Sequence, residues 1–188
     1  QALAPGLGRW RQPPFILLTM RIAVLGLGFM GSTHLKALRG IPGVEVVAVA
    51  SEDARQLSGD LSGVQGNLGG SGERMDFSGL RTYRAWQDAI LDPGADAVDI
   101  CLPTSLHAPA AIAALRAGRH VLVEKPMALD GAAADAMLKA AEASGCTLMV
   151  AQVLRFWPAY CALADTVRSG RLGTVRAATF RRKCAGPR

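Results

Sequence analysis

Three glycines near the start of the chain, Gly26, Gly28 and Gly31, are spaced as G-x-G-x-x-G. They follow a short apolar run, residues 21–25, and open a segment with helical apolar spacing. In such a turn the first glycine permits a sharp bend, the second admits a pyrophosphate, and the third lets helix and strand pack closely. The start of the helix then faces the phosphates. An unrelated tight turn could share this spacing, but its position after a first strand favours a dinucleotide site.

The ribose-binding residue of such a site is expected about 20 residues further on, at the end of the second strand. Here that position is Ser51, which Glu52 and Asp53 follow. A neutral serine would not repel the 2′-phosphate of NADP, and Arg55 lies within one helical turn. Glu52, however, could bind the ribose hydroxyls of NAD. The sequence therefore predicts an NAD(P) site and leaves the choice between NAD and NADP open.

A further candidate is Lys125, in the segment Glu124-Lys125-Pro126 at the end of an apolar run. In open α/β sheets, ligands bind outside the carboxyl ends of the strands, so a lysine there would point toward the ligand. A partly desolvated lysine could exchange a proton with a substrate oxygen during hydride transfer. A surface lysine that ends a strand is the alternative, but this one lies between an acidic residue and a proline.

The elements that would position these residues alternate along the chain. Segments with helical spacing separate short apolar runs, and these runs predict strands at residues 21–25, 44–50, 81–83, 97–103, 120–126 and 147–152. The alternation predicts an α/β fold, a Rossmann-type doubly wound parallel sheet with helices on both faces. Asp130 and Gly145 are expected to begin and end the helix before the last strand. Residues 58–79, which are rich in Gly, Ser and Asp, predict a long loop.

Composition and charge exclude several classes of protein. Half of the 188 residues are apolar and 19% are charged, which is typical of a globular protein. No apolar run reaches the ~18 residues that a membrane span needs, so no membrane partner is expected. The net charge of +6 comes from residues 153–188, which hold 8 Lys and Arg against 1 acidic residue, since residues 1–152 hold 13 against 14. A stripe such as Arg181, Arg182 and Lys183 could touch phosphates, but it has no interleaved aromatic residues and no reading-helix motif, which argues against nucleic acid as a partner.

The four cysteines, Cys101, Cys146, Cys161 and Cys184, form no C-x-x-C pair and lie at no metal-ligand spacing from a histidine. No metal site is therefore predicted. Cys101 and Cys146 lie in or beside apolar runs, where a free cysteine packs as a small apolar residue. Reduced thiols of this kind predict a cytoplasmic protein.

Both ends of the chain differ from its middle. Residues 1–19 begin with glutamine, contain only a short apolar stretch, and are predicted to form an unstructured leader. At the other end, residues 175–180 have the composition of a strand, but no partner strand follows before the chain stops. We therefore expect a truncated chain that ends on a strand with an unpaired edge.

At four places the sequence resembles the Gfo/Idh/MocA oxidoreductases, the family of glucose–fructose oxidoreductase and inositol dehydrogenase. The matching segments are GLGFMG at 26–31, VDICLPTSLHAPAA at 98–111, HVLVEKPMA at 120–128 and RFWPAYCALADTVRSGRLGTV at 155–175. The resemblance implies an NAD(P)-binding Rossmann domain over residues 20–152. It also implies that residues 153–188 are the truncated start of an α+β domain for substrate binding and oligomerisation, and that the full-length form is a homo-oligomer.

The resemblance also implies roles for individual residues. Lys125 would be the catalytic and substrate-orienting lysine, and Arg155 would reach the cofactor or the substrate. His107 would lie beside the nicotinamide ribose, or would simply cap its helix, whereas His34 and His120 are assigned to structure. With the glycine turn and Ser51 included, the expected cofactor-binding residues are Gly26, Gly28, Phe29, Met30, Gly31, Ser51, Leu102, Pro103, Thr104, His107 and Glu124.

The activity that the resemblance implies is an NAD(P)-dependent dehydrogenase or reductase acting on a sugar, a cyclitol or a related polyol. The family completes catalysis with an Asp/His pair in its second domain, and no histidine follows His120 here. A non-catalytic dinucleotide-binding module or sensor is therefore the alternative. A methyltransferase that uses S-adenosylmethionine would share the glycine turn, but it would have no use for the segment around Lys125.

Overall fold

The computed structural model describes residues 19–64, 72–181 and 183 of the chain. Residues 1–18 of the expected leader, the middle of the loop at 58–79, and Cys184 lie outside the described residues. Within the described ranges, no helix is long and apolar enough to cross a membrane.

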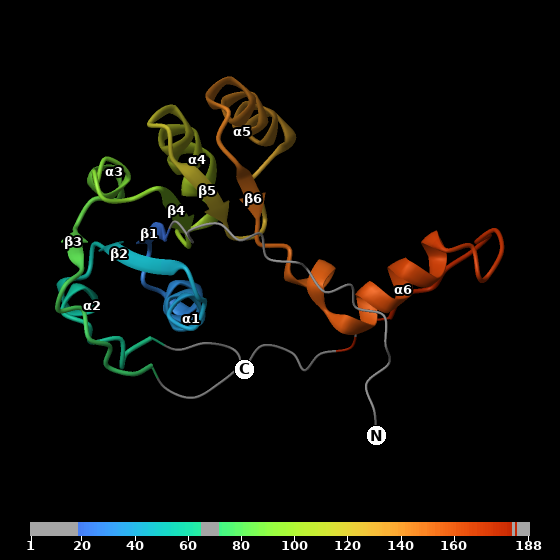
Figure 1. Cartoon of the computed structure of the whole chain (residues 1–188), viewed down its shortest axis with the longest axis horizontal. Coiled ribbons are helices and arrows are strands. Elements are labelled where there is room, and N and C mark those ends of the chain that lie inside the picture. The colour runs from blue at the N-terminus through green and yellow to red at the C-terminus, as the bar shows by residue number, and fades with distance from the viewer. Residues whose placement is uncertain (1–18, 65–71, 182, 184–188) are drawn as a thin grey trace.

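Six parallel strands form one sheet in the order β3-β2-β1-β4-β5-β6 (Figure 1). The strands are β1 (Met20–Leu25), β2 (Val44–Ala50), β3 (Arg81–Tyr83), β4 (Ala97–Ile100), β5 (His120–Val123) and β6 (Leu148–Val150). From β1 the chain builds outward through β2 to β3, and it then returns to place β4 on the other side of β1. The strand order therefore reverses between β1 and β4, where Leu25 pairs with Ile100. This is the doubly wound order that the sequence predicts.

Helices cover both faces of the sheet (Figure 1). They are α1 (Phe29–Leu38), α2 (Ala54–Leu57), α3 (Trp86–Ile90), α4 (His107–Arg116), α5 (Gly131–Ser144) and α6 (Pro158–Arg168). Neighbouring residues of β1 point to opposite faces, because side chains alternate along a strand. Leu25 joins the buried cluster that includes residues of α3, α4 and α5, whereas Val24 joins the cluster that contains Leu35 of α1. The sheet is thus the middle of three layers.

The α1 face of the sheet is also covered by the described ends of the long loop. Leu61, Met75 and Phe77 are buried in the same cluster as Leu35. A single antiparallel bridge between Asp60 and Arg74 brings the two ends of the loop together. The described ends of the loop are therefore part of the hydrophobic core, a role that its Gly- and Ser-rich composition does not predict.

Helix α5 begins and ends at the predicted residues. The side chain of Asp130 accepts a hydrogen bond of 2.8 Å from the backbone N–H of Ala133 and so caps the first turn. Gly145 has φ +69, the left-handed conformation that commonly ends a helix and that favours glycine. Both predictions are confirmed.

The predicted strand at residues 175–180 is wrong. These residues form neither strand nor helix, and Val175 and Phe180 are exposed. A strand is stable only when a neighbour binds its edge, and no described strand pairs with this segment. The sequence analysis also missed α6, which Pro158 begins at a position where its absent N–H is not needed. No residue of α6 is buried, and the helix stands apart from the sheet (Figure 1).

Candidate functional site

In the glycine turn between β1 and α1, two of the three glycines lie where a larger side chain would collide with the backbone. Gly26 has φ +92, and a Cβ there would lie 2.7 Å from the carbonyl oxygen of Cys101. A Cβ on Gly31 would lie 1.8 Å from the carbonyl oxygen of Gly26. Gly28 differs, because no atom lies within 4 Å of its Cβ position. The backbone at Gly28 is therefore open to a ligand.

Gly28 is also the N-cap of α1, and no side chain caps this end of the helix. The first backbone N–H groups of a helix have no partner within the helix, and they favour an anion. A phosphate or pyrophosphate that lies over Gly28 would meet these groups, because a glycine there leaves the approach clear.

A cavity of about 600 Å³ lies in front of this turn, at the carboxyl ends of β1, β2 and β4. Its volume is within the range of sites for small molecules and cofactors. Its position is where the strand order reverses, and in open α/β sheets ligands bind at that point. The residues that line it are Gly26, Leu27, Gly28, Phe29, Met30, Ala50, Ser51, Glu52, Asp53, Gln56, Arg84, Trp86, Cys101, Leu102, Pro103 and Leu106.

The cavity brings together seven of the residues expected to bind a cofactor, namely Gly26, Gly28, Phe29, Met30, Ser51, Leu102 and Pro103. Sequence reasoning missed Arg84 and Trp86, which follow the carboxyl end of β3. The rule that ligands bind outside the carboxyl ends of parallel strands applies to β3 as it does to β1. A search of the residues after every predicted strand would therefore have found both.

The basic residue next to Ser51 in the fold is Arg84 rather than Arg55. The guanidinium of Arg55 binds Asp60 at 3.2 Å, and Arg55 is not part of the cavity lining. Arg84 lines the cavity, and its Nη2 donates a hydrogen bond of 3.0 Å to the carbonyl oxygen of Glu52. Ser51 Oγ donates to Gln56 Oε1 at 2.6 Å. The guanidinium of Arg84 is therefore the positive charge at this end of the cavity.

His107, which was expected beside a ribose, holds two loops together. Its side chain is 1% exposed. Nδ1 lies 2.8 Å from the carbonyl oxygen of Pro126, and Nε2 lies 2.8 Å from that of Leu102. The ring thereby links the loop after β4, which lines the cavity, to the loop after β5, which carries Lys125.

Glu124 and Lys125 differ in exposure although they are adjacent. Glu124 is 4% exposed, and its Oε2 accepts a hydrogen bond of 3.0 Å from the backbone N–H of Lys125. Lys125 is exposed, and no described acidic side chain forms an ion pair with it. Its ammonium group is therefore available to a ligand. The peptide bond between Lys125 and Pro126 is cis.

Six of the expected site residues lie outside the lining of this cavity. Five of them are Gly31, which packs α1 against β1, and Thr104, His107, Glu124 and Lys125, and the sixth is Arg155. Arg155 is further removed, because it belongs to the short 3-10 helix η2 (Val153–Phe156) and lines a separate surface pocket beside α6. The structure therefore does not bring Arg155 to the glycine turn.

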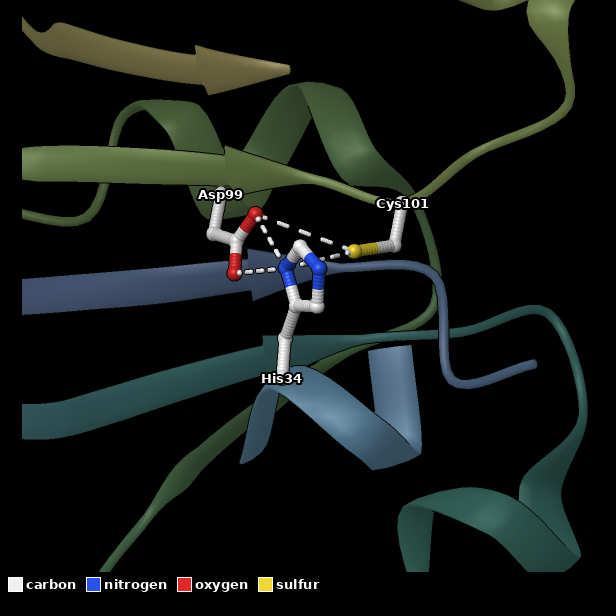
Figure 2. A group of neighbouring side chains, drawn as sticks. All are labelled: His34, Asp99 and Cys101. Carbon is white, nitrogen blue, oxygen red and sulfur yellow. Dashed lines mark hydrogen bonds and ion pairs between the residues drawn. The ribbon is translucent and has the colours of Figure 1, made fainter. Parts of the chain in front are cut away.

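Beneath the glycine turn, His34 of α1 contacts two side chains of the β4 segment (Figure 2). Its Nδ1 lies 2.8 Å from Asp99 Oδ2 and 3.4 Å from Cys101 Sγ. The hydrogen bond to Asp99 raises the pKa of His34 above its ordinary value of 6.5, although burial opposes the rise. An acidic residue inside an apolar strand needs a hydrogen-bond partner, so Asp99 is the residue from which the contact with His34 could have been predicted.

Histidine, aspartate and cysteine are common metal ligands, and the ligand-type atoms of these three residues lie within 4.8 Å of one another. Burial, with the nearby charges of Asp99 and Glu124, raises the pKa of the Cys101 thiol far above its ordinary value. The thiolate is the form that binds metals, and the raised pKa describes the thiol in the chain without a metal. The distances are also those of ordinary hydrogen bonds. We therefore describe the group as a hydrogen-bonded network.

Comparisons with known proteins agree with this geometry. The chain is 35% identical over 168 residues to a 4-carboxy-2-hydroxymuconate-6-semialdehyde dehydrogenase of Sphingobium sp., covering 87% of this chain and 49% of that protein. It is 33% identical over 164 residues to an inositol 2-dehydrogenase of Rhizobium meliloti, covering 87% of this chain and 45% of that protein. The chain thus spans about half the length of these relatives.

Among solved structures, the WlbA dehydrogenase of Bordetella pertussis in complex with NADH and UDP-GlcNAcA is similar, with a TM-score of 0.69 at 25% identity. That match covers 82% of this chain and 43% of the other. A family model described as "Oxidoreductase family, NAD-binding Rossmann fold" matches residues 20–152, which include the glycine turn, the cavity and Lys125. The chain therefore belongs to the Gfo/Idh/MocA family of oxidoreductases.

Proposed function

We propose that this chain is the cofactor-binding part of an NAD(P)-dependent dehydrogenase or reductase. The observation that carries the proposal is the cavity in front of the open backbone at Gly28, at the reversal of the strand order. Relatives named as dehydrogenases, one solved with NADH, support the same conclusion. The sheet order, the glycine turn and the cavity are the features that a dinucleotide site requires.

The residues of the cavity fit the parts of a dinucleotide. The backbone at Gly28, Phe29 and Met30 would hold the pyrophosphate at the start of α1. Ser51 and Arg84 would lie at the adenosine ribose, since Ser51 directly follows the carboxyl end of β2. Leu102 and Pro103, with Thr104 beside them, would lie toward the nicotinamide, and the loop that contains them is held by His107.

Lys125 is the residue that we assign to the chemistry. When bound, the nicotinamide would exchange a hydride with a carbon of the substrate. A hydride transfer of this kind also moves a proton at the substrate oxygen, and an exposed lysine ammonium can give or take that proton. Glu124 holds the Lys125 backbone through its N–H, and Arg155 would bind substrate only if η2 approached this edge of the sheet.

The substrate class that we propose is a sugar, a cyclitol or a related polyol or keto-sugar. Support comes from relatives named inositol 2-dehydrogenase and D-apiose dehydrogenase. We propose a cytoplasmic enzyme that acts as a homo-oligomer in its longer form, with residues 20–152 as the cofactor domain and residues 153–188 as the start of a second domain. The second candidate, a non-catalytic dinucleotide sensor, shares the cavity and differs only in lacking turnover.

The first experiment is a titration of this chain with NADH and with NADPH, followed by nucleotide fluorescence and calorimetry. Micromolar binding of either would support the proposal, and binding of neither would contradict it. The second experiment compares the longer gene product with its Lys125→Ala variant on NADPH or NADH and a panel of keto-sugars. We expect turnover that the variant loses. Binding without turnover in the wild type would favour the sensor.

A further inference from the structure

Two buried acidic side chains lie on opposite edges of one imidazole ring. Asp99 Oδ2 lies 2.8 Å from Nδ1 of His34, and Glu124 Oε1 lies 3.2 Å from its Nε2. The side chains of Asp99 and Glu124 are only 1% and 5% exposed. Among the described residues, neither acid has a lysine or arginine within ion-pair distance. Of the side chains that the structure describes, His34 is therefore the only cationic group within ion-pair distance of both acids.

This arrangement determines the protonation of the ring. An ionised carboxylate can only accept hydrogen bonds, so a nitrogen that faces one is stabilised when it carries a hydrogen. Nδ1 of His34 is hydrogen-bonded to Asp99, and Nε2 lies within ion-pair distance of Glu124, so the two acids together favour the doubly protonated imidazolium. Two buried carboxylates without a cation would be strongly unfavourable in a poorly solvated interior. The raised pKa of His34 agrees with this geometry.

Glu124 connects this ring to Lys125. Its Oε2 accepts the hydrogen bond from the Lys125 N–H, whereas its Oε1 is buried and has no hydrogen-bond partner of its own. The charge of His34 at 3.2 Å is thus what compensates Oε1. If that charge is lost, Glu124 is left with an uncompensated buried oxygen, and the lowest-energy response is to move or to bind a proton.

We propose that His34 is a positioning residue for Lys125: its imidazolium holds Glu124, and through Glu124 the Lys125 backbone, against the helix of the glycine turn. His34 lies on α1, which starts immediately after that turn, so the ring joins the pyrophosphate end of the site to the loop of the proposed catalytic lysine. The inference rests on the proposed function only for the role of Lys125.

The groups that face His34 are few. Asp99 and Cys101 face it from the β4 segment, and Glu124 faces it from the end of β5. The strands β1 and β2 contribute apolar side chains such as Val24 and Val49 to the core beside α1. Of these groups, burial raises the pKa of the Cys101 thiol, and the hydrogen bond to Asp99 raises the pKa of His34.

A nuclear magnetic resonance titration of the ¹⁵N-labelled chain tests the coupling without any cofactor. We expect both ring nitrogens of His34 to carry hydrogens at neutral pH, and the Lys125 amide resonance to shift with the same midpoint as the ring. In Glu124→Gln the His34 midpoint should fall, and the Lys125 amide should no longer follow it. A neutral His34 ring at pH 7, or a Lys125 amide that is unchanged while His34 titrates, would overturn the proposal.

A second measurement connects the ring to binding. We expect His34→Gln to weaken NADH or NADPH binding about tenfold below the His34 midpoint, the loss of roughly one charged hydrogen bond, and to remove the pH dependence. The control is His120→Gln, because His120 accepts a hydrogen bond from the Thr147 N–H and forms no ion pair with a described carboxylate. Equal pH dependence in wild type and His34→Gln would count against the proposal.

The two measurements separate the failure of this inference from the failure of the proposed function. If no form of the chain binds a dinucleotide, the proposed function fails, and the titration of the Lys125 amide still decides the role of His34. If His34→Gln does not fold, as circular dichroism would show, the wild type and Glu124→Gln decide it. If the dinucleotide binds and the amide does not follow the ring, only the inference fails.

Discussion

Nδ1 of His107 lies 2.8 Å from the carbonyl oxygen of Pro126, a residue 19 positions further along the chain. The other ring nitrogen lies 2.8 Å from the carbonyl oxygen of Leu102. Because the ring is buried, its removal would leave two buried carbonyl oxygens without their protein partner. One side chain thus holds the cavity loop and the Lys125 loop in a common position.

The first prediction concerns this contact. We expect His107→Ala to lower the free energy of unfolding by about 2–4 kcal/mol, because two buried carbonyl groups lose their partner and a cavity remains. Urea denaturation followed by circular dichroism measures the change. His120→Ala, at a half-buried histidine, is the control and should lower the free energy of unfolding by a smaller amount. A His107→Ala variant as stable as the control would show that the two loops hold their position without the ring.

The second prediction separates the glycines of the turn. Gly31→Ala should destabilise the fold by more than about 2 kcal/mol, because its Cβ would collide with backbone. Gly28→Ala should change stability by less than about 1 kcal/mol and weaken dinucleotide binding, because the methyl group fills the approach to the backbone. Denaturation and an NADH titration measure the two effects.

The control for the glycine series is Gly63→Ala, which lies outside the cavity and has no atom within 4 Å of its Cβ position. It should leave dinucleotide affinity unchanged. A Gly28→Ala chain that binds as tightly as Gly63→Ala would mean that no phosphate approaches the turn at that residue.

The third prediction concerns the choice between NAD and NADP. Arg84 lines the cavity with Ser51, whereas Arg55 is paired with Asp60. We expect Arg84→Ala to weaken NADPH binding about tenfold, the value of one charged hydrogen bond, and NADH binding by less than about twofold. Arg55→Ala is the matched control, and it should change the affinities for NADPH and NADH only slightly and to the same extent. Calorimetric titration measures each affinity, and an equal loss for both nucleotides in Arg84→Ala would exclude a phosphate contact.

The fourth prediction is a pH dependence of the stability of the fold, and it arises at the end of the strands opposite to the cavity. The backbone and side chain of Arg21 donate hydrogen bonds to Asp96, and these lower the pKa of Asp96 from 3.8 to about 2. A carboxylate with a lowered pKa stabilises the fold above its ordinary pKa, and the contribution is lost as the pH falls from about 4 toward about 2. The pair is partly exposed, so the contribution is modest.

Thermal unfolding at a series of pH values tests this pair. Asp96→Asn should lower the melting temperature at pH 7 and should reduce the further loss between about pH 4 and pH 2. Asp165→Asn, at an exposed acid of α6, is the control and should follow the wild type. An Asp96→Asn curve parallel to that of the wild type in this acid range would contradict the assignment.

The sequence predicted the sheet and the glycine turn well because both depend on local patterns. Apolar runs such as residues 44–50 are long enough to indicate buried strands, and the glycine spacing is imposed by backbone contacts at Gly26 and Gly31. The prediction of a strand at residues 175–180 failed for the opposite reason. Their composition is that of a strand, but pairing needs a neighbour, and composition cannot supply one.

The parts of the site that sequence reasoning missed depend on contacts distant in sequence. Arg84 reaches the cavity only because β3 pairs with β2, which brings the end of β3 beside Ser51. His34 of α1 and Glu124, which directly follows β5, form an ion pair although 90 positions separate them in the sequence. Asp99 is an acidic residue within an apolar strand that the sequence analysis did not single out, and only the packing of α1 identifies its partner as His34.

The reversal of strand order at β1 and β4 also divides the sheet into two three-stranded halves. Within the described strands, β1 and β4 form the only ladder that joins them. The cavity lies at one end of this seam and is lined from both halves, by Gly26 and by Leu102. A ligand that binds only when the halves are joined would resist their separation by RT ln(1 + [L]/Kd), where [L] is the free ligand concentration. Amide hydrogen exchange in β1 and β4 should therefore slow together on binding, while the outer strands β3 and β6 continue to open locally.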